Sequence, residues 1–291
     1  MRPDTSYEVN LARSALIMSV YAGDRVAFLR RALHSILSQD HPSRILVGVD
    51  GPVGADLDAC LSEVERAGEL QVFRYSVRRG LAAVLNDLID VALAEKSCEA
   101  VFRMDADDVC CYGRFVAQVA YLRRHQDVGV AGTSAWIIDE FDRRTGRLTK
   151  LSDSGVLMRR LAFDSPFVHP TVVFRADVLR RGVRYPTHTE TFEDMALWAS
   201  LPRMGVRFGN LDVPLLEFRQ TVQTARKRKG GLKKLLGEAR IRLDYIWATY
   251  PYLLDLATVV VAVVVVKALF PPRVLQALMK ARESMLRRSL L

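Results

Sequence analysis

Apolar and polar residues alternate along the first 110 positions in a way that predicts four buried strands separated by helices. Each strand is a short, continuous apolar run, as expected for parallel strands covered on both faces. The runs lie at 15–20, 44–49, 70–75 and 100–104, and apolar residues recur at helical spacing at 26–37, 58–67 and 81–88. This alternation predicts an α/β fold with an open, Rossmann-like, mostly parallel sheet flanked by helices. Asp24 is expected to cap the first helix.

The pattern changes after about residue 128. An apolar stretch from 128, a charged turn around 143–147 and the run at 148–151 predict a β-hairpin. Beyond it we expect a strand at 172–174, a helix starting near Glu193, and two closing strands at 205–209 and 213–219. Residues 14–225 are therefore predicted to form one domain, preceded by an extension at 1–13.

Polar side chains follow each of the first four predicted strands. They are Tyr21 after the first, Asp50 after the second, the Arg78 and Arg79 loop after the third, and Asp105 with Asp107 after the fourth. In open parallel sheets, ligands bind beyond the carboxyl ends of the strands. We therefore expect these side chains to share one site.

Three carboxylates, Asp105, Asp107 and Asp108, lie within four residues of one another. Like charges at this spacing repel one another, and burying them unpaired is expensive. Mg²⁺ or Mn²⁺ would neutralise them and leave coordination positions open for substrate phosphates. An acidic surface turn accounts for the same residues when the motif is taken alone.

The other polar residues suggest a nucleotide pocket. Tyr21 would pack against a base, Asp50 would accept a hydrogen bond from the imide N–H of uracil or thymine, and the arginine loop would meet base or diphosphate. An ordinary turn before Gly51-Pro52 explains Asp50 as well. A solvated loop explains at least one of the two arginines.

Two acidic residues, Glu193 and Asp194, begin a predicted helix. They either complement the helix dipole or include a general base that takes a proton from an attacking acceptor hydroxyl. The spacing does not choose between these interpretations. His169 is similarly either structural or close to the phosphates, and Arg219 either reaches a diphosphate or begins a basic linker.

Composition and charge restrict the class of protein. Hydrophobic residues make up 50% and charged residues 26% of the chain, which is typical of a globular protein. Residues 226–291 hold 14 Lys/Arg against 4 Asp/Glu, a net charge of +10, so the other 225 residues carry −1. A nucleic-acid enzyme would carry basic residues around its cleft, and we therefore expect no nucleic-acid partner.

The four cysteines, at 60, 98, 110 and 111, match no zinc or redox spacing, and the first 14 residues have no apolar core. Both features predict a cytoplasmic protein. In the basic tail, residues 256–266 are uncharged, but a bilayer span needs roughly 20 residues. We expect residues 226–291 to be helical and to attach to the inner face of the cell membrane peripherally or monotopically. A true span, or a tail packed on its own domain or on a partner, is the alternative.

Six segments occur in the order found in family 2 glycosyltransferases: ALIMSVYAGD (15–24), RILVGVDGP (44–52), RRGLAAVLNDLI (78–89), FRMDADDV (102–109), HPTVVF (169–174) and TFEDMALWASL (191–201). The chain resembles bacterial members that build capsular polysaccharide, exopolysaccharide or O-antigen. The resemblance covers about residues 14–220. It implies a GT-A fold with a nucleotide-binding part at about 14–110 and an acceptor part at about 111–225. It also implies a nucleotide-sugar donor, with UDP foremost, a Mn²⁺ or Mg²⁺ cofactor, inversion at the anomeric carbon, and a saccharide or lipid-linked saccharide acceptor.

The resemblance also suggests roles for single residues. Asp105 and Asp107 become the DxD pair for metal and diphosphate, with Asp108 beside them, and Asp194 becomes the catalytic base with Glu193 on the acceptor side. Tyr21, Asp50, Arg78, Arg79 and Asn86 become the remaining nucleotide-sugar contacts, although Asn86 could equally pack. Two positions depart from the pattern: Asp-Gly-Pro stands at 50–52 where many relatives have Asp-Asp-Gly-Ser, and Arg78 stands where Asn is frequent.

Three other functions are alternatives to this hypothesis. A sugar-nucleotide pyrophosphorylase needs a Gly-rich basic loop after the first strand, where this chain has one glycine, Gly23. A phosphatase with Asp105 as nucleophile leaves Asp50, the arginine loop and Glu193-Asp194 unexplained. A non-catalytic membrane-associated adaptor that binds through its basic tail is the alternative outside the enzymes.

Overall fold

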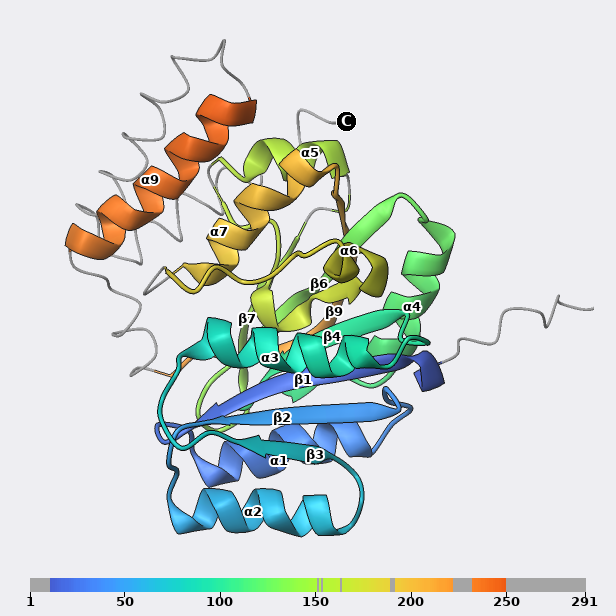
Figure 1. Cartoon of the computed structure of the whole chain (residues 1–291), viewed down its shortest axis with the longest axis vertical. Helices are drawn as coiled ribbons and strands as arrows, with labels where there is room; N and C mark the ends of the chain where they lie inside the picture. Colours follow the sequence, from blue (N-terminus) through green and yellow to red (C-terminus); the bar gives the residue numbers. More distant parts are fainter. Residues whose placement is uncertain are drawn as a thin grey trace, which may run out of the picture. The chain divides into compact units, whose positions relative to one another are not determined.

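A nine-stranded sheet with helices on both faces forms most of the described protein (Figure 1). The computed structural model describes residues 11–150, 152, 154–162, 164–188, 192–221 and 232–249. The chain divides into two compact units between Lys229 and Gly230. The sheet belongs to the first unit, and helix α9 (Leu232–Thr249) to the second.

The first half of the sheet has the expected alternation of strands and helices. After a short 3₁₀ helix, η1 (Leu11–Arg13), the elements are β1 (Ser14–Tyr21), α1 (Val26–Leu37), β2 (Arg44–Asp50), α2 (Ala55–Arg66), β3 (Gln71–Arg74), α3 (Leu81–Ala94) and β4 (Ala100–Asp105). Strand β1 is almost wholly buried, which explains its continuous apolar sequence.

The second half has shorter elements. They are β5 (Val109–Cys110), α4 (Arg114–Arg124), β6 (Val128–Ile138), β7 (Arg144–Leu148), α5 (Ser154–Arg160), the 3₁₀ helix η2 (His169–Thr171), β8 (Val173–Arg175), α6 (Ala176–Arg180), α7 (Glu193–Ser200), the 3₁₀ helix η3 (Leu201–Met204) and β9 (Arg207–Arg219). The hairpin of β6 and β7 is present, with its turn at 139–143.

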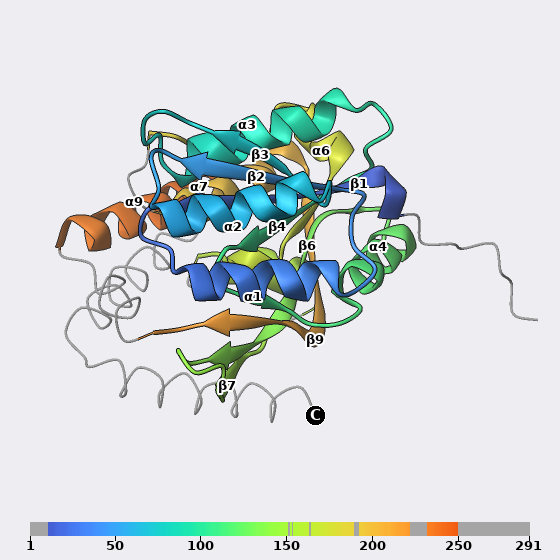
Figure 2. The ribbon, with the colours of Figure 1, turned by 90° about the horizontal axis from the view of Figure 1, so that it is seen from below.

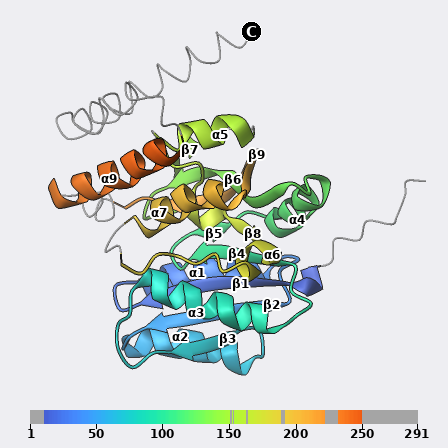
Figure 3. The same cartoon turned by 45° about the horizontal axis from the view of Figure 1, so that its top comes forward.

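The strand order is β3-β2-β1-β4-β8-β6-β9-β5, with β7 paired to β6. The first four strands in this order are parallel. Strand β8 is antiparallel to both of its neighbours, whereas β9 is parallel to β6. Figure 3 shows β1, β2 and β3 on one side of β4 and β8, and β6, β7 and β9 on the other side. The parallel half brings the carboxyl ends of β1, β2 and β4 to one edge, where Tyr21 pairs with Asp50, and Ser19 with Asp105.

Helices cover both faces of the parallel half. Helices α1 and α2 pack side by side on one face (Figure 2), and α3 packs on the other against β1 and β2. Gly48 of β2 allows the close approach of α3, because a Cβ at this position would lie 2.3 Å from Cγ1 of Val84.

Three local predictions were wrong. The two closing strands form the single strand β9, which accommodates register shifts along β6. The charged stretch predicted as the hairpin turn lies largely in β7, because the Asp139 carboxylate accepts the N–H groups of Phe141 and Arg143 and closes the turn earlier. Asp24 does not cap α1: Arg25 is the N-cap residue without a side-chain cap bond, and the Asp24 carboxylate accepts the N–H of Tyr21.

The predicted helical tail is described only in part. Helix α9 covers 18 residues of it, and the apolar stretch at 252–270 lies outside the described residues. Within the described ranges, no helix combines the length and apolar character needed to cross a membrane.

Candidate active site

A cavity of about 530 Å³ opens at the carboxyl ends of β1, β2 and β4. It is lined by Ser19, Tyr21, Asp24, Asp50, Arg78, Leu81, Asp105, Ala106 and Asp107. Five of the side chains predicted to share a site therefore line one cavity. Its volume is within the usual range for small-molecule sites, about 300–1,000 Å³.

Tyr21 and Arg78 form one wall of the cavity. The Arg78 guanidinium carbon lies 5.7 Å from the centroid of the Tyr21 ring, within the range of a cation–π contact. The Arg78 side chain is 74% exposed, so it is available to a ligand. Gly23 leaves room for the ring, because a Cβ there would lie 2.4 Å from Cε2 of Tyr21.

Asp50 anchors the arginine loop. Its Oδ1 accepts the backbone N–H groups of Arg79 at 2.5 Å and Gly80 at 3.1 Å, and its Oδ2 lies 3.8 Å from Nε of Arg78. Gly80 has a φ of 87°, a conformation that glycine adopts without strain. Asp50 therefore fixes the backbone that carries Arg78, whatever further contact it makes with a ligand.

Two residues predicted to contact the nucleotide-sugar lie outside the cavity lining. The Arg79 guanidinium pairs with Asp87 and lies 4.9 Å over the ring of Tyr75. The Asn86 amide donates to the carbonyl of Tyr185 and accepts its N–H, both at 2.8 Å. Asn86 thus joins α3 to the segment that precedes α7.

Replacing Asn86 with Ala is expected to lower the free energy of unfolding by about 1–3 kcal/mol, because it leaves both backbone groups of Tyr185 without this partner. Chemical denaturation measures this effect. A variant with unchanged stability would contradict the structural role assigned to the amide.

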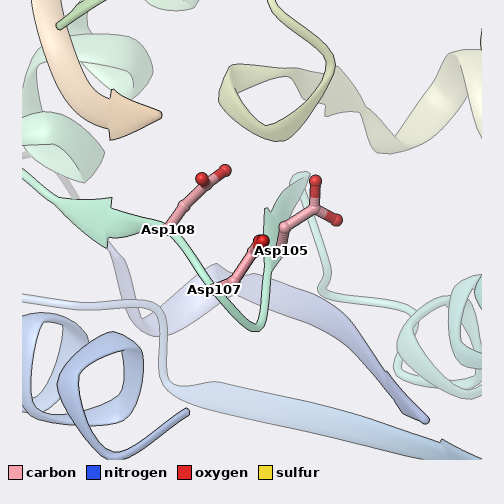
Figure 4. A group of neighbouring side chains, drawn as sticks. All are labelled: Asp105, Asp107 and Asp108. Atoms are coloured by element: carbon pink, nitrogen blue, oxygen red, sulfur yellow. The ribbon is translucent and has the colours of Figure 1, made fainter. Parts of the chain in front are cut away.

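The three aspartates form a cluster (Figure 4), and two of them, Asp105 and Asp107, line the cavity. One carboxylate oxygen from each of Asp105, Asp107 and Asp108 lies within 4.8 Å of the others. Asp108 is fully buried, and its Oδ2 has no hydrogen-bond partner. An orphaned buried oxygen beside two further carboxylates fits a hard divalent cation such as Mn²⁺ or Mg²⁺.

Burial and mutual repulsion shift the protonation of the cluster. Burial, followed by the charge of Asp105, raises the pKa of Asp107 from 3.8 to about 6. Burial and the charges of Asp107 and Asp105 raise the pKa of Asp108 well above its usual value. The cluster therefore holds protons in the folded protein at a pH where free carboxylates are ionised.

Mn²⁺ is expected to raise the melting temperature more at about pH 7.5 than at about pH 5. Without a cation, the stability linked to the raised pKa of Asp107 is complete below pH 3.8 and is lost as the pH rises through about 6. A bound cation favours the ionised form of Asp107 and so restores the stability that is lost at higher pH. At lower pH, protons bind the carboxylates and displace the cation. Differential scanning fluorimetry measures the shift, and an equal shift at both values would contradict this coupling.

A buried arginine, Arg103, also belongs to the site and was not predicted from the sequence; its side chain is 2% exposed. Its guanidinium makes a two-point contact with the Asp105 carboxylate and also interacts electrostatically with Asp108 and Glu193. A buried charge is costly unless paired, and a charged residue inside the apolar run 100–104 was the available signal. Arg103 fixes the orientation of Asp105.

Arg219 proved to be neither a free cation nor the start of a linker. Its side chain is fully buried and donates to main-chain and side-chain oxygens of the protein. Its place at the end of a strand was predicted from the sequence, but its partners, which lie far away along the chain, were not.

Glu193 and Asp194 occupy the first turn of α7. Asp194 Oδ1 accepts the N–H of Met195 at 2.7 Å. Burial and the charge of Asp194 raise the pKa of Glu193, which also interacts with Arg103 and Asp105. The acidic pair therefore lies within electrostatic range of the residues that hold the aspartate cluster.

His169 lies beside the same region. Its Nε2 is 3.0 Å from the hydroxyl of Tyr185. Burial, with a contribution from Arg103, holds the pKa of His169 well below 6.5, so the ring is neutral at physiological pH. This contact to Tyr185 explains His169 as a packing residue.

Comparison with known proteins identifies the family. Residues 16–182, more than half of the chain, match the family described as Glycosyl transferase family 2. A UDP-Gal:alpha-D-GlcNAc-diphosphoundecaprenol beta-1,3-galactosyltransferase of Escherichia coli is 27% identical over 240 residues, which are 81% of this chain and 84% of the relative.

Solved structures share the fold. TarS 1–349 of S. aureus in complex with UDP superposes with a TM-score of 0.57 at 16% identity, over 81% of this chain and 65% of that chain. Mannosyltransferase PcManGT from Pyrobaculum calidifontis, in complex with GDP-Man and Mn²⁺, gives 0.54 at 16% identity, over 94% and 80%. The predicted GT-A fold is confirmed. The chain belongs to glycosyltransferase family 2 and is related to the bacterial transferases that build polysaccharides and lipid-linked sugars.

Proposed function

We propose that the protein transfers a hexose from a UDP-sugar to a lipid-linked saccharide in the synthesis of a bacterial surface polysaccharide, with inversion at the anomeric carbon. The observation that carries the proposal is the aspartate cluster, two of whose members line a cavity together with Tyr21, Asp50 and Arg78. The relative from E. coli uses UDP-Gal and a diphosphoundecaprenol acceptor, as its name states.

The nucleoside would bind between Tyr21 and the arginine loop. The Tyr21 ring offers an apolar face, and Asp50, whose Oδ2 lies 3.8 Å from Nε of Arg78, lines the same cavity. An imide N–H is a donor that a carboxylate accepts, whereas the exposed guanidinium of Arg78 suits carbonyl or phosphate oxygens. UDP fits this set of donors and acceptors.

Asp105, Asp107 and Asp108 would hold Mn²⁺ or Mg²⁺. When bound, the cation supplies positive charge to the diphosphate that departs with the nucleoside. Arg103 keeps the Asp105 carboxylate oriented through its two-point contact. Asp107 lines the cavity, and Asp108 lies buried behind it.

Asp194 would act as the general base, with Glu193 beside it on the acceptor side. The acceptor hydroxyl passes its proton to the Asp194 carboxylate as its oxygen forms a bond to the anomeric carbon, and the bond to the departing phosphate oxygen breaks. Attack opposite the leaving group inverts the configuration. Burial and the neighbouring Asp194 raise the pKa of Glu193, which marks this helix start as a place where a carboxylate can accept a proton.

Residues 226–291 would hold the enzyme at the inner face of the membrane, where a lipid-linked acceptor resides. Their net charge of +10 favours anionic lipid. Within α9, basic residues and exposed apolar side chains (Leu236 and Trp247) occur on one helix, a combination found in interfacial helices.

Transfer assays with the full chain test this function. UDP-sugars, a dTDP-sugar and a GDP-sugar are each offered with Mn²⁺ and a polyprenyl-diphosphate sugar in anionic or neutral vesicles. We expect transfer from one UDP-sugar, faster on anionic vesicles. Formation of UTP and a sugar 1-phosphate from a UDP-sugar and added pyrophosphate would favour a pyrophosphorylase, and binding to vesicles without any nucleotide binding would favour the adaptor.

A further inference from the structure

The buried side chain of Arg219 connects the aspartate cluster to the turn between β6 and β7. Its Nε donates to the carbonyl of Asp107 at 2.7 Å, and its backbone N–H donates to Oδ1 of Asp108 at 2.8 Å. Two of the three candidate metal ligands are thus held by one residue. Neither bond uses an oxygen of the Asp107 carboxylate, and Asp107 is one of the residues that line the cavity.

The other two guanidinium nitrogens bind the β6–β7 turn. Nη1 donates to the carbonyl of Asp139 at 2.8 Å, and Nη2 donates to Oδ1 of Asp142 at 2.6 Å. Arg219 also lies over the ring of Phe28, 4.1 Å from its centroid. Every nitrogen of the side chain therefore has a protein partner, and the group is fixed from three sides.

Asp142 supplies the carboxylate that pairs with this buried charge. Among the described residues, Asp142 is the one whose carboxylate lies within ion-pair distance of the Arg219 guanidinium. The second oxygen of this carboxylate lies 3.2 Å from Nε of Arg31. The backbone of Asp142 has a φ of 62°, a conformation that costs free energy for residues other than glycine and that Asp and Asn tolerate best. The turn retains this conformation while it presents the carboxylate to Arg219.

The ion pair with Asp142 determines which carboxylate the Arg219 guanidinium binds. Without Asp142, a buried guanidinium would lie next to the aspartate cluster with no carboxylate partner of its own. The Asp107 and Asp108 carboxylates would then be the nearest anions for it to recruit. An arginine bound to these oxygens competes directly with a divalent cation.

We propose that Arg219 and Asp142 form a positioning pair for the metal site, in which Asp142 keeps the guanidinium away from the carboxylates of Asp107 and Asp108. The inference rests on the proposed metal-dependent function. It makes the β6–β7 turn part of the machinery that prepares the cation site, although no atom of the turn would touch the cation.

Asp142→Asn tests the pair without disturbing the core. Asparagine has the size of aspartate and tolerates the same backbone conformation, and the Asp142 side chain is 30% exposed, so the variant is expected to fold. We expect the Mn²⁺ concentration for half-saturation to rise about tenfold, the lower end of the usual effect of residues behind a metal ligand. The donor KM at saturating Mn²⁺ should stay within about twofold, because the nucleoside pocket is unchanged.

The matched control is Arg143→Gln in the same turn. Arg143 is 72% exposed, and its guanidinium pairs with Asp139, whereas the guanidinium of Arg219 pairs with Asp142. The Mn²⁺ affinity of Arg143→Gln should therefore equal that of the wild type. Direct Mn²⁺ titration by electron paramagnetic resonance with UDP present gives a readout independent of turnover. A melting temperature recorded without metal separates loss of stability from loss of affinity.

Each result has one interpretation. Reduced Mn²⁺ affinity in Asp142→Asn alone supports the positioning pair. Wild-type affinity in Asp142→Asn, or an equal loss in Arg143→Gln, overturns it and leaves the metal site itself intact. If the wild-type protein shows no Mn²⁺-dependent binding at all, the proposed function and this inference fail together.

Discussion

Replacing Asp194 with Asn is expected to slow sugar transfer by about 10²–10⁴-fold, the usual contribution of a general base. The amide keeps the size of the side chain and can still accept the N–H of Met195, but it cannot take a proton from the acceptor. UDP binding in the presence of Mn²⁺ should remain at the wild-type level, because Asp194 lies outside the lining of the nucleotide cavity. Initial rates at saturating donor and acceptor measure the rate of transfer, and a titration with UDP measures the affinity for the nucleotide.

Glu193→Gln is the natural comparison for this variant, since both residues lie in the first turn of α7. We expect a smaller loss of rate, seen mainly as a higher acceptor KM. If Glu193→Gln abolishes transfer while Asp194→Asn keeps it within about tenfold of wild type, then Glu193 is the base. The raised pKa of Glu193 gives that outcome a physical basis.

Replacing Asp107 with Asn is expected to lower the rate of transfer by about a thousandfold, equivalent to roughly 4 kcal/mol of transition-state stabilisation. The variant loses one of the three carboxylates that converge within 4.8 Å. It also removes the repulsion that contributes to the raised pKa of Asp108, so the metal-free protein should be as stable as wild type or more so.

Asp127→Asn is a matched control, because Asp127 pairs with Arg207 on the surface and its side chain is 53% exposed. Its rate and its response to Mn²⁺ should be those of the wild type. Transfer by Asp107→Asn at the wild-type rate with EDTA present would show that the cluster is not a metal site.

The position of the cavity could be predicted from the sequence because the carboxyl ends of neighbouring parallel strands lie at the same edge of a sheet. Once β1, β2 and β4 are parallel neighbours, the residues that follow them meet at one edge, and Tyr21, Asp50 and Asp105 do so. Apart from the pairing of the strands, the position of the cavity depends on no contact between residues that are distant in the sequence.

Side-chain direction could not be predicted in the same way. Arg78 and Arg79 are neighbours in one loop, yet the first lines the cavity and the second pairs with Asp87. Asn86 lies in α3, the helix that follows this loop, and binds the backbone of Tyr185, 99 residues away. Such choices depend on partners that only the folded chain brings together.

The burial of two arginines was not predicted from the sequence. Arg103 and Arg219 have almost no solvent exposure and make their contacts with the aspartate cluster, in the case of Arg219 across 112 residues. Statistically, a charged residue belongs on the surface, so sequence reasoning assigns it there. In this protein, burial of arginine is balanced by a group of aspartates that itself needs positive charge.

Titration of the 291-residue chain with UDP by calorimetry, with Mn²⁺ and then with EDTA, tests the central claim most directly. We predict that UDP binds in the presence of Mn²⁺ and that its affinity weakens at least about tenfold when the cation is removed, because the diphosphate would reach the aspartates through the cation. Equal affinity in EDTA, or no binding by a folded protein under either condition, would contradict it.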